Sequence, residues 1–148
     1  MMTSRFFLRP EKVCNALLGE SVLLCAEWKY DGMGYSCTTA DYCIDAISSG
    51  GLANTLTLYA ESEFRDIVQE VKLVLMVNNK ATRKVAIDKF RDTILTLFRE
   101  IDIAVPTGLI YALYEENPTR FEQDYGTVEL QLDRTRTDTW CVVILPAL

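Results

Sequence analysis

The chain contains no histidine among its 148 residues. Without an imidazole it has no Ser-His-Asp or Cys-His catalytic set, and no histidine ligand for zinc. The cysteines offer no zinc motif either, because no two of them have the C-x-x-C spacing. These absences exclude a large share of enzyme chemistry, and we expect the protein to bind no metal ion and no cofactor.

Long hydrophobic runs are also missing. A run such as Leu73–Val77 is far shorter than the roughly 18 residues of a helix that crosses a bilayer. The apolar stretch Phe6–Leu8 is too short for the core of a signal peptide, and the last residues contain no lipidation motif. The sequence therefore predicts no contact with a membrane.

The five cysteines are an odd number, which does not suggest a disulfide framework. They are Cys14, Cys25, Cys37, Cys43 and Cys141. We interpret all of them as reduced thiols, and with no secretion signal in view we expect a cytoplasmic protein.

Acidic residues outnumber basic ones by 21 to 15, and the net charge is −6. Because a negative chain repels a phosphate backbone, nucleic-acid binding is not expected. Hydrophobic residues make up 49% of the chain, as in ordinary globular proteins. No linker or repeat interrupts the sequence, so we expect one domain over residues 1–148.

Residue spacing predicts the elements of this domain. The apolar positions of 62–77 and 81–101 follow the three-four spacing of amphipathic helices, and we expect these two helices to form an antiparallel pair. Turn residues 31–34 predict a hairpin within 21–39, and alternation predicts a second hairpin from 128–133 and 140–145.

Shorter segments complete the prediction. We expect short helices over 10–19 and 40–48, favour a strand over 52–60, and leave 109–116 open between helix and strand. The predicted fold class is α+β: a single domain with antiparallel hairpins at both ends, packed on a central pair of amphipathic helices.

Acidic residues gather in the last third of the chain, on both sides of Pro118. In an exposed loop they form an acidic rim more readily than a metal cage, because metal sites need carboxylates on rigid elements. We expect this surface to meet the basic groups of a partner protein. Its residues are Glu115, Glu116, Glu122, Asp124 and Asp133.

The start of the second predicted helix is basic, with Lys80, Arg83 and Lys84. The helix dipole disfavours cations at this end, so one hypothesis is that these residues bind an anionic group or a partner. The alternative is a solvated helix face in which Asp88 compensates Lys84 four residues earlier.

The end of the first predicted helix is apolar on nearly all sides, and it has to be covered by more than one neighbour. We expect it to lie deep in the core, or to contact a partner or a second copy of the chain. A homodimer could form here or at an exposed hairpin edge. The residues concerned are Leu73, Val74, Met76 and Val77.

Together these features favour a small acidic protein–protein interaction module, such as a chaperone, an adaptor or an immunity-type inhibitor, rather than an enzyme. The alternative is a small-molecule-binding domain or a histidine-independent enzyme with a pocket of Tyr, Asp and Arg side chains. The candidates for that pocket are Tyr30, Tyr35, Asp41 and Arg120.

Overall fold

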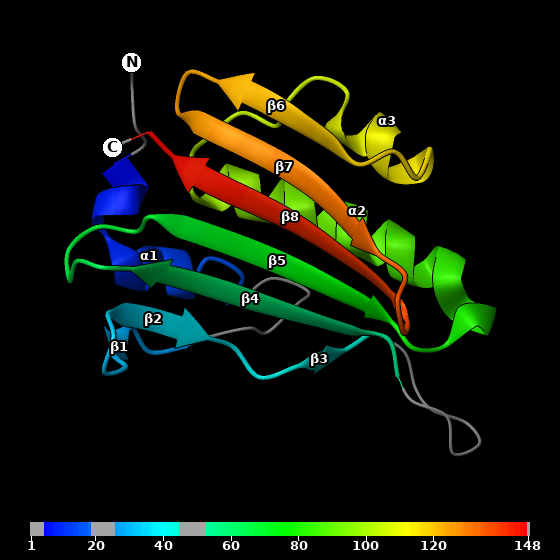
Figure 1. Cartoon of the computed structure of the whole chain (residues 1–148), viewed down its shortest axis with the longest axis horizontal. Coiled ribbons are helices and arrows are strands. Elements are labelled where there is room, and N and C mark those ends of the chain that lie inside the picture. Colours follow the sequence, from blue (N-terminus) through cyan, green and yellow to red (C-terminus); the bar gives the residue numbers. More distant parts are fainter. Residues whose placement is uncertain (1–4, 19–25, 45–52, 148) are drawn as a thin grey trace.

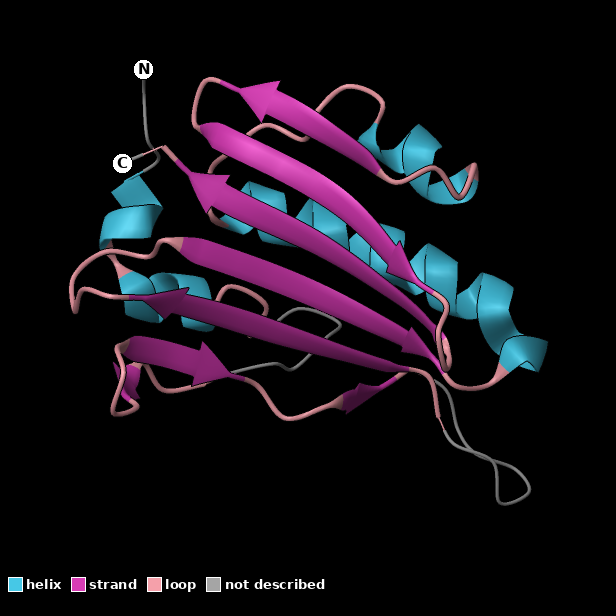
Figure 2. Ribbon diagram, in the orientation of Figure 1, coloured by secondary structure: helices cyan, strands magenta, loops and turns pink. Residues whose placement is uncertain are grey.

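Strands dominate the computed structural model, which describes residues 5–18, 26–44 and 53–147 (Figures 1 and 2). The described strands form one antiparallel sheet in the order β1-β2-β4-β5-β8-β7-β6, with β3 paired to β4 off this path. Their bounds are β1 Lys29–Tyr30, β2 Tyr35–Thr38, β3 Tyr42–Cys43, β4 Thr55–Ser62, β5 Glu70–Val77, β6 Thr119–Gln123, β7 Gly126–Asp133 and β8 Asp138–Pro146.

The long helix α2 crosses one face of this sheet and lies behind the strands in Figure 1. Its side chains Phe90, Ile94 and Leu97 are fully buried in one core cluster with residues of β5 and β8. None of the described helices covers the opposite face. The helical elements are η1 Arg5–Leu8, α1 Pro10–Cys14, η2 Lys80–Thr82, α2 Arg83–Glu100 and α3 Leu109–Tyr114.

The predicted helix over 62–77 is wrong, because this segment forms the end of β4, a turn and the whole of β5. Val71 and Leu75 are four residues apart, a spacing that puts two side chains on the same face of a helix or of a strand. The burial of β5 has the two-residue period of a strand, with Leu73 buried and its neighbours only partly so. Pairing with β4 and β8 on either side gives the backbone its hydrogen bonds.

The predicted fold class is therefore wrong, because the central pair of helices is not present among the described residues. A large antiparallel sheet packs against one long helix, instead of hairpins that pack on a pair of helices. The second predicted helix is confirmed as α2, although it ends at Glu100, ahead of the Val105-Pro106 pair.

Most of the other predicted elements agree with the structure. The hairpin turn 31–34 joins β1 to β2, and the C-terminal hairpin is β7 and β8. Segment 52–60 contains most of β4, and 109–116 contains the helix α3. The helix expected over 40–48 is wrong at β3, and its residues 45–48 lie outside the described residues.

The prediction of reduced cysteines is wrong for Cys14 and Cys37, which form a disulfide between α1 and β2. Cys43 and Cys141 are free, and Cys25 lies outside the described residues. In the described parts of the chain, no helix has the length and apolar character needed to span a membrane.

Candidate functional site

The β1–β2 hairpin is held by one carboxylate at its turn. Asp31 accepts hydrogen bonds from the backbone amides of Met33 and Gly34, at 3.0 and 2.9 Å, and from the Ser36 hydroxyl at 2.9 Å. These bonds, with that from the Met33 amide foremost, lower the pKa of Asp31. The turn therefore keeps a negative charge at neutral pH.

Gly34 brings this turn against the end of β4. A Cβ atom at position 34 would lie 2.5 Å from the Ser62 carbonyl oxygen, so only glycine fits without a backbone shift. The turn and the β4–β5 connection thus become two walls of one surface groove.

Aromatic side chains line the hairpin in a row. The rings of Trp28 and Tyr35 stack with centroids 6.3 Å apart, and the ring of Tyr30 lies 5.5 Å from that of Tyr35 in a tilted arrangement. The Trp28 indole N–H donates to the Arg65 carbonyl oxygen at 2.7 Å. This bond fixes the indole ring against the β4–β5 connection.

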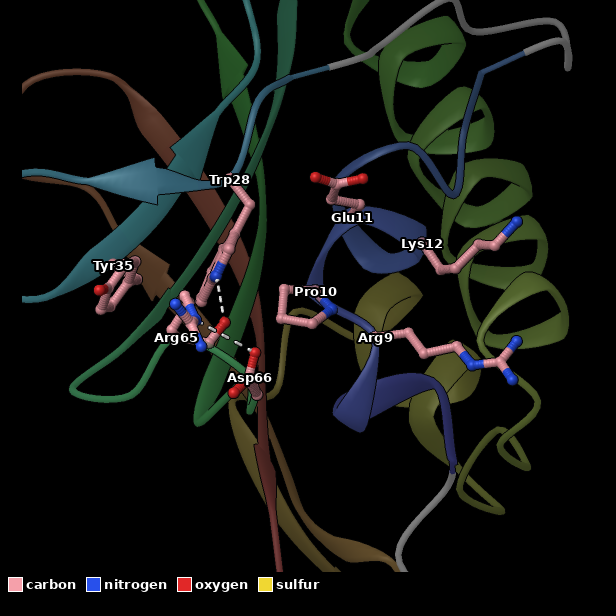
Figure 3. A pocket seen from close by; sticks show the side chains of 8 residues that line it. All are labelled: Arg9, Pro10, Glu11, Lys12, Trp28, Tyr35, Arg65 and Asp66. Carbon is pink, nitrogen blue, oxygen red and sulfur yellow. Dashed lines mark hydrogen bonds and ion pairs between the residues drawn. The ribbon is translucent and has the colours of Figure 1, made fainter.

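A cleft of about 480 Å³ opens beside Trp28 (Figure 3). Pro10 faces Trp28 across the hollow, while the side chains of Arg9 and Lys12 extend away from it. Arg65 forms an ion pair with Asp66 at 3.5 Å. The disulfide from Cys14 to Cys37 ties the α1 wall of the cleft to the hairpin. We call this hollow the aromatic cleft; its lining residues are Arg9, Pro10, Glu11, Lys12, Trp28, Tyr35, Arg65 and Asp66.

A second hollow of about 470 Å³ adjoins the aromatic cleft, and Tyr35 lines both. We call it the acidic groove, because four carboxylates line it and no lysine or arginine does. Its residues are Asp31, Met33, Gly34, Tyr35, Glu61, Ser62, Glu63, Gln69 and Glu70.

Two of these carboxylates crowd one another. Glu61 and Glu70 lie directly opposite across β4 and β5, a placement that costs stability for like charges. A hydrogen bond with Glu70 raises the pKa of Glu61, and partial burial and the negative charge of Glu70 act in the same direction. Lys72 pairs with Glu70 at 3.1 Å and relieves only part of this repulsion.

The acidic residues predicted from the sequence are spread out in the structure. Glu115 and Glu116 follow α3, whereas Glu122 and Asp124 lie at the other end of β6, by its turn into β7. Glu122 pairs with Arg120 at 2.9 Å. Asp133 ends β7 and accepts from the backbone and the hydroxyl of Thr135.

The predicted basic helix start and the predicted acidic surface meet each other. The Arg83 guanidinium bonds Glu116 and lies 3.4 Å from Asp138, and Arg134 pairs with the same two carboxylates. Lys84 pairs with Asp88 at 3.2 Å, which confirms the predicted compensation. Lys80 lies exposed in η2.

The predicted apolar surface is divided between the two faces of β5. Leu73 and Val77 are buried in the core, whereas Val74 is half-buried and Met76 is 39% exposed. The expectation that they share one helix end is wrong, because strand geometry sends alternate side chains to opposite faces.

The alternative pocket is not assembled as expected. Tyr30 and Tyr35 are ring neighbours, but Asp41 bonds the Thr57 hydroxyl and Arg120 lies on β6, at the other edge of the sheet. Among the described residues, no group of three or more Asp, Glu, Cys or His side chains is placed to hold a metal ion.

Sequence reasoning missed Trp28, Asp31, Glu61, Glu63 and Glu70 as site residues. The aromatic residues on both sides of the 31–34 turn were a usable signal for Trp28. The glutamates gave none, since the predicted helix over 62–77 separated Glu61 from Glu70. Comparisons of the chain with protein families, with curated proteins and with solved structures found no match.

Proposed function

We propose that the protein binds a partner protein, as a chaperone, an adaptor or an inhibitor does, and that it holds a basic, extended segment of that partner along the β1–β2 hairpin. The observation that carries this proposal is that the aromatic cleft and the acidic groove, which four carboxylates line, share the lining residue Tyr35. Arginine and lysine side chains are attracted both to carboxylates and to the faces of aromatic rings.

Charge supports a basic partner. Of the four carboxylates that line the acidic groove, Glu70 forms an ion pair with Lys72, which lies just outside the groove. Binding of a guanidinium between Glu61 and Glu70 would relieve the repulsion between them. The net charge of −6 also speeds the encounter with a positively charged partner.

Shape supports an extended segment. The aromatic cleft and the acidic groove share the lining residue Tyr35, so a chain that follows the hairpin around Tyr35 passes Trp28 first and Asp31 next. Side chains with a long apolar stem and a charged head suit such a surface.

A peptide library displayed on phage and selected on the immobilised protein tests this function. We expect the selected peptides to be rich in arginine and lysine, and to lose binding to the double variant Asp31→Asn/Glu63→Gln. The matched control Glu115→Gln/Asp124→Asn removes the same charge on a distant surface and should retain binding. Loss of binding in the control variant alone would place the site on the surface around α3 and β6 and overturn the proposal.

We also propose a cytoplasmic location, in which the Cys14–Cys37 bridge would be an exception, because disulfides are rare in that compartment. Alkylation of intact cells with N-ethylmaleimide before lysis decides the matter. A cytoplasmic chain would carry the label on Cys14 and Cys37, whereas a chain in an oxidising compartment would carry it on neither.

A further inference from the structure

On the sheet face opposite α2, one row of side chains runs across five strands. The charges of this row are complementary to those of the same row taken in reverse order. Tyr59 of β4 pairs with Lys72 of β5, and Lys72 pairs with Val143 of β8. Val143 pairs with Glu129 of β7, and Glu129 pairs with Arg120 of β6. In order across five strands the row is aromatic, positive, apolar, negative, positive.

We propose that a second copy of this chain packs on this face, about a two-fold axis that runs along β8 between the two sheets. Such an axis passes over Val143, which is only 5% exposed within one chain, and places it opposite Val143 of the second copy. It exchanges β5 with β7, because these strands lie on either side of β8. Lys72 of each copy then faces Glu129 of the other.

The outer members of the row match as well. The same axis exchanges β4 with β6, so Arg120 of one copy lies over Tyr59 of the other. Beside Tyr59 the face has a hollow of about 280 Å³. Glu61, Glu70, Lys72 and Val74 are among its lining residues. A hollow with two carboxylates and an aromatic wall suits the guanidinium of Arg120.

Exposed apolar side chains lie in the row and beside it. Tyr59, in the row, is 38% exposed, while Leu145 of β8 and Met76 of β5, beside it, are 37% and 39% exposed. Val74 of β5 pairs with Cys141 of β8, and both are half-buried. Covering these groups removes apolar area from water, which favours association.

The charges of Lys72 and Glu129 favour this axis over the other symmetric choice. A two-fold axis across the strands would leave each strand over itself, with Lys72 against Lys72 and Glu129 against Glu129. Stacked sheets cross at about 30°, and neighbouring strands lie only about 4.8 Å from β8. Lys72 and Glu129 therefore stay within reach of each other in the proposed arrangement.

Charge reversal gives a test specific to this axis. Within one chain Lys72 and Glu129 are separated by β8, so a large coupling between them has to come from a second copy. In the Lys72→Glu homodimer both cross-contacts become repulsive, and the same holds for Glu129→Lys. In a heterodimer of the two variants, residues 72 and 129 carry opposite charges at both cross-contacts again.

The measurement is sedimentation equilibrium of the full chain from micromolar to near-millimolar concentration. We expect the wild type to form dimers, each single variant to raise the dimer Kd by about tenfold or more, and an equimolar mixture to form 1:1 heterodimers at wild-type affinity. A wild type that stays monomeric throughout, single variants with the wild-type Kd, or a mixture without heterodimers would each overturn the proposal.

Two controls keep the outcome tied to this face. Lys80→Glu and Glu115→Lys make the same charge changes on residues outside the row, and both should dimerise like the wild type. If a reversal unfolds the chain by circular dichroism, Lys72→Gln and Glu129→Gln remove the contacts with less disturbance. The proposal then requires both of these to weaken the dimer.

Discussion

Glu61 and Glu70 lie directly opposite one another across the β4–β5 pair, at the place where the sheet meets the hairpin turn held by Asp31. Two carboxylates at directly paired positions destabilise a strand pair. A hydrophobic or oppositely charged residue at either position would not have this effect. Their position in the acidic groove connects this cost to the proposed binding of a cationic group.

The first prediction concerns the stability cost of this pair. Glu61→Gln should stabilise the dilute protein at pH 7 by roughly 0.5 kcal/mol, because it removes the like charge opposite Glu70. Because the pKa of Glu61 is raised in the folded state, protonated Glu61 stabilises the fold at low pH. This stabilisation is lost as the pH rises through the folded-state pKa. The gain from the substitution should therefore fade below about pH 4. Urea unfolding across this pH range, with Glu63→Gln as the control, measures the difference.

The second prediction concerns the disulfide that joins α1 to β2. Cys14 and Cys37 are 23 residues apart in sequence, and a closed loop of this size stabilises a fold by about 3 kcal/mol. Reduction, or the double variant Cys14→Ala/Cys37→Ala, should lower the free energy of unfolding by about this amount. Cys43→Ala should leave it unchanged. Equal urea midpoints with and without reductant would contradict the bridge.

The third prediction concerns the contact between α2 and the sheet. Phe90 is fully buried in the core cluster, so Phe90→Ala should cost about 3–5 kcal/mol through lost contacts and the cavity left behind. Leu95 on the same helix is 41% exposed, and Leu95→Ala should change stability by only about 0.5 kcal/mol. Thermal and urea unfolding of the two variants compare the buried and exposed faces.

The fourth prediction concerns thiol reactivity. Burial raises the pKa of Cys141 to about 11, with smaller contributions from Glu70 and Glu129 that Lys72 opposes. Cys43 is exposed and should react with iodoacetamide at pH 8 long before Cys141. The rate at Cys141 should then climb about tenfold per pH unit until the pH reaches its pKa. Peptide mapping after timed quenching gives both rates, and fast labelling of Cys141 at pH 8 would contradict its burial.

Much of the local structure could be predicted from the sequence. The turn 31–34, the strands β7 and β8 and the helix α2 each have a period or a turn signal that no neighbour overrides. The failure was at 62–77, where Val71 and Leu75 satisfy both the helix and the strand period, and where only pairing with β4 and β8 decides between them. A run buried on one face and half-buried on the other, such as Glu70–Val77, resembles one side of a buried helix when it is seen alone.

The site was less predictable than the fold. The carboxylates that gather at the hairpin come from 31, 61, 63 and 70, and their proximity depends on the β2–β4 and β4–β5 registers. The carboxylates that are close in sequence, by contrast, are separated by the length of β6 or matched by arginines such as Arg83 and Arg120. Clusters of charged residues along the sequence therefore do not predict where charge accumulates on the surface of this antiparallel sheet.

The most direct test of the proposed function is an NMR titration of the ¹⁵N-labelled protein with a tetra-arginine peptide at low ionic strength. Saturable chemical-shift changes should centre on the backbone amides of Asp31, Gly34, Tyr35 and Glu63, and the Trp28 indole N–H should move with them. Changes centred on residues 115–124, or changes that do not saturate, would contradict the assignment of the acidic groove as the partner-binding site.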